Sequence, residues 1–132
     1  MRKPRGGIDA TTETAVREIL KSKAEARIYL YLLRHQGARS DDIVKGTKLH
    51  PSTVRELLSK MHGQRLIFRK KLKNDSIGKN PYAYHAVAPL KLLQSYVDEI
   101  EYQLTKIANL ATSSEGHQRV VKISIHERGG GL

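Results

Sequence analysis

The chain contains no cysteine, no tryptophan and a single phenylalanine. The lack of cysteine excludes disulfide bonds, thiolate zinc sites and cysteine nucleophiles. The scarcity of aromatic residues argues against RNA binding, because RNA-binding sheets stack bases on several exposed rings. No apolar run approaches the roughly 20 residues that span a bilayer. We therefore expect a cytoplasmic protein without a membrane partner.

The sequence also lacks the short motifs of catalytic and metal sites. Its six histidines form no HExxH pair, and neither a Walker-type phosphate loop nor a nucleophile elbow is present. We expect no metal, no cofactor and no enzymatic activity. The function should therefore lie in binding.

Positive charge is what the chain has in excess. Its 24 Lys and Arg residues against 13 Asp and Glu give a formal net charge of +11, which favours a polyanionic partner such as nucleic acid. Residues 50–89 hold eight of these cations against two carboxylates, whereas residues 90–111 hold two cations against three carboxylates. The charge is thus concentrated in one part of the chain.

Apolar spacing predicts two helices at the start, over Thr11–Lys21 and from Ser22 to Gly37. In the second of these, Ser22 and Glu25 have the spacing of a capping box. The length of 132 residues and 39% hydrophobic content suit one domain with a single core. These helices should supply part of that core.

The following two helices have the pattern of a helix-turn-helix. Ser40 is placed to cap the first of them, and Gly46 is placed to end it. Pro51 suits the first turn of the next helix. Its inward stripe consists of Val54, Leu57, Leu58 and Met61.

After this helix, the helical spacing of apolar residues ends and the pattern becomes that of two β-strands joined by a turn. Leu66–Lys73 reads as one strand, Asn74–Pro81 as its turn, and Tyr82–Val87 as the return strand. A basic hairpin directly after a helix-turn-helix is a wing. The predicted fold is therefore mainly α with a small β-hairpin: a winged helix-turn-helix, followed by a long C-terminal dimerisation helix.

The helix that begins at Pro51 is the predicted DNA recognition helix. Small polar and charged side chains lie opposite its apolar stripe, where they can reach phosphates and base edges in the major groove. These residues are Ser52, Thr53, Arg55, Glu56, Ser59 and Lys60. Arg55 suits a bidentate contact to guanine. The alternative is an ordinary solvated helix face.

The wing and its flank should bind the phosphate backbone, because lysine and arginine displace counterions from it regardless of sequence. The predicted contacts are Ser40, Arg69, Lys70, Lys71, Lys73 and Lys79. The alternative is that these lysines protect the edge of the sheet from aggregation.

The cleanest periodicity in the chain lies after Pro89, where apolar residues recur at spacings of three and four for three heptads. They are Leu90, Leu93, Val97, Ile100, Leu104, Ile107 and Ala111. The pattern favours a coiled coil between two copies of the chain over packing within one chain. The predicted divisions are a basic N-terminus at 1–10, the DNA-binding domain at 11–88, the dimerisation helix at 89–111, and a tail at 112–132 that is either strand or disordered.

Three stretches resemble the TrmB-type archaeal transcriptional regulators: Glu25–Leu30, Ser40–Ile67 and Tyr84–Pro89. The resemblance spans about residues 22 to 111. It implies a winged-helix domain, a dimerising coiled-coil helix, and binding to promoter DNA as a dimer. Larger members continue into a sugar-binding effector domain, for which the 21 residues after Ala111 are too few. We expect a short form without that domain and do not favour a small-molecule effector.

Together these features predict a homodimeric transcriptional regulator that binds double-stranded DNA in a sequence-specific way. The alternative function is a winged-helix protein-interaction module of a transcription-initiation or other complex. RNA binding and catalysis rank below both.

Overall fold

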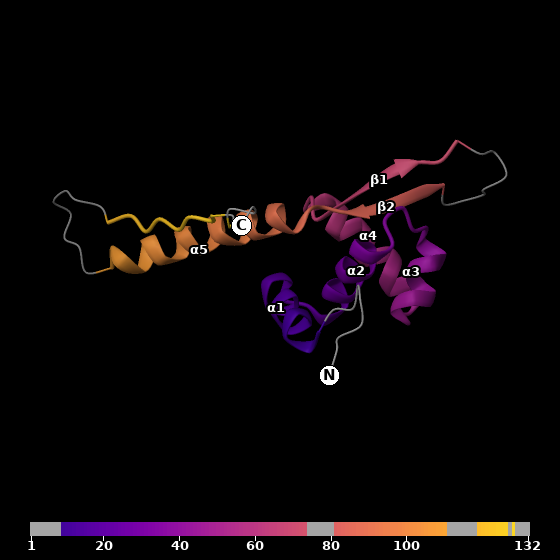
Figure 1. Ribbon diagram of the computed structural model, residues 1–132, viewed down its shortest axis with the longest axis horizontal. Coiled ribbons are helices and arrows are strands. Elements are labelled where there is room, and N and C mark those ends of the chain that lie inside the picture. Colours follow the sequence, from indigo (N-terminus) through magenta and orange to yellow (C-terminus); the bar gives the residue numbers. More distant parts are fainter. Residues whose placement is uncertain (1–8, 74–80, 111–118, 127, 129–132) are drawn as a thin grey trace. The chain divides into compact units, whose positions relative to one another are not determined.

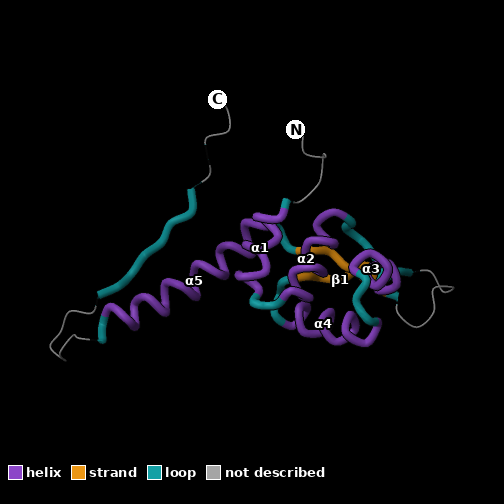
Figure 2. The backbone as a smooth tube through the Cα atoms, turned by 90° about the horizontal axis from the view of Figure 1, so that it is seen from below, coloured by secondary structure: helices purple, strands orange, loops and turns teal. Residues whose placement is uncertain are grey.

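The computed structural model describes residues 9–73, 81–110, 119–126 and 128. In order, the elements are α1 (Ala10–Leu20), α2 (Lys23–Arg34), α3 (Ser40–Thr47), α4 (Pro51–Gly63), β1 (Ile67–Lys71), β2 (Tyr82–Ala86) and α5 (Pro89–Ala108). They form two units, Met1–Val87 and Ala88–Leu132 (Figures 1 and 2). The described part of the chain contains no helix that is both long and apolar enough to cross a membrane.

The first unit is a helical core closed by the hairpin. Side chains from α2, α3, α4 and β1 meet in its interior. The most deeply buried are Ile28, Tyr29, Leu32, Ile43, Val54, Met61 and Ile67. The predicted stripe of α4 is confirmed at Val54, Leu58 and Met61, which are buried, while Leu57 is half-buried. Burial of such side chains is the main stabilising contribution to a fold of this size.

The hairpin has the register of a two-stranded antiparallel sheet, with Ile67 opposite Ala86 and Lys71 opposite Tyr82. Ala38, which lies between α2 and α3, forms an isolated antiparallel β-bridge with Tyr84 of this sheet. The backbone of Tyr84 accepts from Gly37 N and donates to Ala38 O, both at 2.8 Å. The helix-turn-helix is thereby fixed to the wing, and the arrangement is the predicted winged helix.

Tyr29 links α2 to the end of the hairpin. Its phenol donates to the carbonyl of Val87 at 2.7 Å. The side chain is only 1% exposed, and this burial raises the pKa of Tyr29 to about 12.

Two sequence-based assignments in α3 were wrong. Ser40 does not cap the helix but is its first residue; the N-cap is Arg39, whose N–H donates to the Asp42 carboxylate at 3.1 Å. Gly46 does not end the helix, which continues to Thr47 and is followed by Lys48 in the left-handed region at φ 60°. A side chain at position 46 would collide with the ring of Tyr31. Gly46 therefore lets α3 approach α2.

The second unit consists of α5 and an extended segment of residues 119–126 that runs back along it (Figure 1). The predicted stripe of α5 is open to solvent at Leu90, Leu93, Leu104 and Ile107, while Val97 and Ile100 are half-buried. Ala111 lies outside the described residues. The buried residue of α5 is Leu92, which is not part of the predicted stripe.

Candidate nucleic-acid interface

The start of α4 is stabilised by a residue that the sequence did not single out as a cap. His50 is the N-cap, and its Nδ1 accepts from Ser52 N at 3.2 Å. The same ring nitrogen lies 2.8 Å from Ser52 Oγ. Pro51 occupies the first turn, where its missing N–H costs nothing. Histidine is not among the usual N-cap residues, so no strong sequence signal marked this role.

The face of α4 opposite the core carries polar and charged side chains. Ser52, Arg55, Glu56 and Ser59 are exposed, with spacings of three and four residues that place them on one side of the helix. Thr53 is half-buried. Neither Arg55 nor Glu56 forms a hydrogen bond or ion pair with another described residue. Their hydrogen-bonding groups are therefore available to a ligand.

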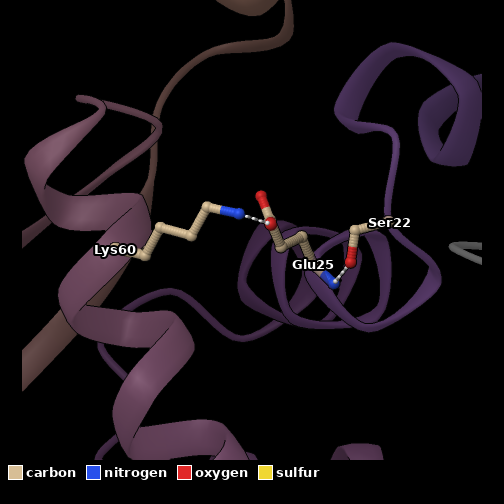
Figure 3. Close-up of polar contacts among 3 residues, drawn as sticks. All are labelled: Ser22, Glu25 and Lys60. Atoms are coloured by element: carbon tan, nitrogen blue, oxygen red, sulfur yellow. Dashed lines mark hydrogen bonds and ion pairs between the residues drawn. The ribbon is translucent and has the colours of Figure 1, made fainter.

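Lys60, predicted to lie in the same group, has a partner within the protein. Its ammonium contacts Glu25 Oε2 at 2.8 Å, which ties α4 to α2 (Figure 3). The Glu25 side chain is 4% exposed and that of Lys60 is 53% exposed. The hydroxyl of Ser22 accepts from Glu25 N at 3.1 Å, which confirms Ser22 as the N-cap of α2. The Glu25 carboxylate thus serves a contact between helices.

The wing presents its cations to solvent. Arg69, Lys70 and Lys71 are exposed on β1, and Lys73 is exposed just beyond it. Lys79 lies outside the described residues. The guanidinium of Arg69 lies over the ring of Tyr82, 4.3 Å from its centroid, which holds the charge in place across the two strands. Ser40, at the start of α3, is half-buried.

The two faces of the hairpin differ in what they carry. Tyr84 and Ala86 are buried on the core side, together with Ile67. On the opposite side Phe68 is exposed and stacks on His85, with ring centroids 5.0 Å apart and planes inclined by 11°. Ile67, Tyr84 and Ala86 thus anchor the wing to the core, and Phe68 is open to solvent, although Ala83 on the same face as Phe68 is buried.

This surface presents groups that can bind nucleic acid. In the described part of the chain no cluster of three or more His, Asp or Glu residues could hold a metal ion. The exposed groups are hydroxyls, one carboxylate and cations, which can contact phosphates and base edges.

Comparison with known proteins agrees with this arrangement. The family model described as "Sugar-specific transcriptional regulator TrmB" matches residues 22–90, which are 69 of the 132 residues. No curated protein sequence matches the chain.

Two solved structures illustrate the likeness of the fold. A possible transcriptional regulator from Methanosarcina mazei Go1 is 23% identical, with a TM-score of 0.51 over 75% of this chain and 94% of that one. A point mutant of MepR from Staphylococcus aureus, bound to an oligodeoxyribonucleotide, is 18% identical, with a TM-score of 0.50 over 80% of this chain and 77% of that one. Because the family model spans more than half of the sequence, the chain belongs to the TrmB family of transcriptional regulators.

Proposed function

We propose that the protein is a sequence-specific regulator that binds double-stranded DNA as a homodimer. In this proposal α4 enters the major groove, the wing contacts phosphates, and α5 pairs with α5 of a second copy. The observation that carries it is the exposed face of α4, whose Arg55 and Glu56 have no partner among the described residues. This face belongs to the unit that also carries the basic wing.

Base recognition is assigned to α4. Ser52, Thr53, Arg55, Glu56 and Ser59 provide donors and acceptors, and the guanidinium of Arg55 suits guanine in the major groove. Lys60 remains a predicted contact, although its ammonium already binds Glu25. A DNA role for Lys60 therefore requires that this ion pair be shared or broken.

Phosphate contact is assigned to the wing, through Arg69, Lys70, Lys71, Lys73 and Lys79, and to Ser40 at the start of α3. If each of the five cations neutralises one phosphate, the log–log slope of affinity against salt should be about −4 to −5 per protomer. The MepR mutant of similar fold was solved with an oligodeoxyribonucleotide, which supports DNA as the partner.

The first test is a titration of the full chain with random duplex DNA over a range of salt concentrations. We expect binding that weakens steeply with salt and a slope that falls by roughly 2 per protomer in a Lys70→Ala/Lys71→Ala variant. A Lys91→Ala/Lys106→Ala variant, which loses the same charge from α5, is the matched control and should keep the slope. No binding at about 50 mM salt would favour the protein-interaction module instead.

The second test addresses sequence reading. After selection of preferred sites, Arg55→Lys should relax the preference at one base pair, because lysine keeps the charge but loses the bidentate geometry. The expected cost on the preferred site is about 1–3 kcal/mol, with little change on random DNA. An unchanged preference would mean that Arg55 does not read bases.

A further inference from the structure

Exposed apolar surface is concentrated in the second unit. Among the described residues, all the exposed large apolar side chains except Phe68 lie in Ala88–Leu132. They are Leu90, Leu93, Tyr102, Leu104, Ile107, Leu110, Val120 and Ile123. Leu92 is the one buried residue that the structure describes in this unit. A helix and an extended segment with so little buried surface lack a core of their own.

The same unit carries no net charge. Met1–Val87 contains 19 Lys and Arg residues against 8 Asp and Glu, or +11, whereas Ala88–Leu132 contains five against five. Two copies of the first unit therefore repel each other, and two copies of the second do not. If a second copy of this chain covers the exposed apolar surface, the second unit is where it can do so.

Residues 119–126 are held on α5 by a regular set of polar contacts. The side-chain amide of Asn109 exchanges two hydrogen bonds with the backbone of Arg119, at 2.9 and 3.0 Å. Val121 N then donates to Thr105 Oγ1 at 2.9 Å, and Ile123 N donates to Glu101 Oε2 at 2.7 Å. The donors are thus two residues apart on the segment, and the acceptors are four residues apart on the helix.

The two spacings match because of backbone geometry. Four helical residues rise by about 6 Å, and two extended residues span roughly 6.6 Å. Glu101, Thr105 and Asn109 therefore form a ladder of acceptors that fixes the register of the segment. The docked segment carries the β-branched residues Val120, Val121, Ile123 and Ile125 along the helix.

The ladder lies beside the predicted dimerisation stripe. Residues three and four apart are neighbours on a helix surface, so Glu101 borders Val97 and Leu104 of that stripe. The segment therefore extends the apolar surface of α5 at its margin. Val120 is 58% exposed and Ile123 is 36% exposed.

We propose that residues 119–126, docked on α5, form with the apolar stripe of that helix a single surface on which a second copy of this chain packs. The proposal rests on the homodimer of the proposed function and goes beyond it, because it assigns the C-terminal segment to the interface. It also makes Thr105 a positioning residue that acts through the segment.

The test measures the dimer dissociation constant of full-length variants by sedimentation equilibrium. Burial of one large apolar side chain at the interface changes the dimer dissociation constant by roughly tenfold or more. Ile123→Asp should therefore raise this constant by about tenfold or more. Ser124→Asp, which adds the same charge at an exposed polar position, should change it far less. A similar effect of both variants would mean that charge alone is responsible and would overturn the proposal.

Thr105 provides a second test that leaves the segment sequence unchanged. Thr105→Val removes the hydroxyl that accepts from Val121 N and should weaken the dimer several-fold. Thr105→Ser keeps the hydroxyl and should restore the native value. Far-ultraviolet circular dichroism of each variant checks that the helices are intact.

Leu104→Asp separates the two proposals, because Leu104 lies on the stripe and not on the ladder. If Leu104→Asp dissociates the dimer while Ile123→Asp and Thr105→Val leave it unchanged, the segment lies outside the interface and the homodimer stands. If the native chain is a monomer at all concentrations, both proposals fail.

Discussion

Burial changes the chemistry of Tyr29. Its neutral phenol is favoured in the folded protein, because burial raises its pKa from the ordinary value of 10.0 to about 12. The stabilisation is fully present below pH 10 and is lost as the pH rises through about 12. We expect Tyr29→Phe to lower the free energy of unfolding by about 1 kcal/mol at pH 7, through loss of the bond to Val87.

In alkaline solution the stability advantage of the native chain over Tyr29→Phe should shrink and then reverse, because the loss that ionisation of Tyr29 brings by pH 12 exceeds about 1 kcal/mol. Between pH 10 and 12, Tyr29 contributes up to about 1.4 kcal/mol per pH unit to the loss of stability of the native chain, and the variant lacks this contribution. Urea unfolding curves across this range provide the measurement. Tyr102→Phe is the control, because it removes the same hydroxyl from a side chain that is 65% exposed. If the free energies of unfolding of the native chain and of Tyr29→Phe fall in parallel between pH 10 and 12, the prediction is contradicted.

Single residues also show where sequence-based inference reached its limit. The cap at Ser22 was predictable because a serine three residues before a glutamate is a local signal. The cap at His50 was not predicted, because a ring nitrogen accepts a backbone hydrogen bond only in suitable geometry. Gly46 was predicted to end the helix, but glycine is required there because any side chain would collide with the ring of Tyr31, which lies on another helix. Gly46 could not be explained from its neighbours in the sequence, whereas the partner of His50 is local but histidine is an unusual N-cap residue.

Between elements, the contact of Glu25 with Lys60 joins α2 to the predicted recognition helix. Lys60→Met would leave a buried carboxylate without its partner, so we expect the free energy of unfolding to fall by about 1–2 kcal/mol, a value moderated by the exposure of Lys60. A double-mutant cycle with Glu25→Gln measures the coupling. Ser59→Ala is the control on the same helix and should have little effect on stability.

The same variant tests the predicted DNA contact of Lys60. If the lysine acts only between helices, Lys60→Met should lower DNA affinity no more than Lys91→Met, which removes the same charge from α5. A larger loss of affinity with Lys60→Met, at equal stability, would assign the ammonium to DNA.

Elements with a clear apolar period were predicted well, and long-range contacts were not. The stripe of α4 follows from local sequence, and the change of period after it marked the hairpin, so α4 and the hairpin were found within a few residues of their ends. The isolated β-bridge at Ala38 has no periodic pattern in the sequence, because it depends on the backbone of Tyr84. The docking of residues 119–126 depends likewise on acceptors in α5. On α4, the exposure of Arg55 and Glu56 was predicted from the sequence. The ion pair of Lys60 with Glu25 was not predicted.

In the whole molecule, the two units divide charge and apolar surface between them. The first carries all of the net charge of +11, and the second carries nearly all of the exposed large apolar side chains in the part of the chain that the structure describes. If the first binds DNA and the second binds a second copy, the two associations should respond to salt in opposite ways. Phosphate contact is weakened by salt, whereas repulsion between the two basic units is screened by it.

We therefore predict that raising the salt concentration from about 50 to 200 mM will lower DNA affinity by orders of magnitude while the dimer dissociation constant stays constant or falls. Sedimentation equilibrium and duplex titration in the same buffers provide the two curves. The Lys91→Ala/Lys106→Ala variant makes the second unit acidic, so its attraction to the basic units should flatten the salt response of the dimer but leave the DNA slope intact. A dimer that dissociates as steeply with salt as the DNA complex would show that charged groups hold it together, contrary to an apolar interface on α5.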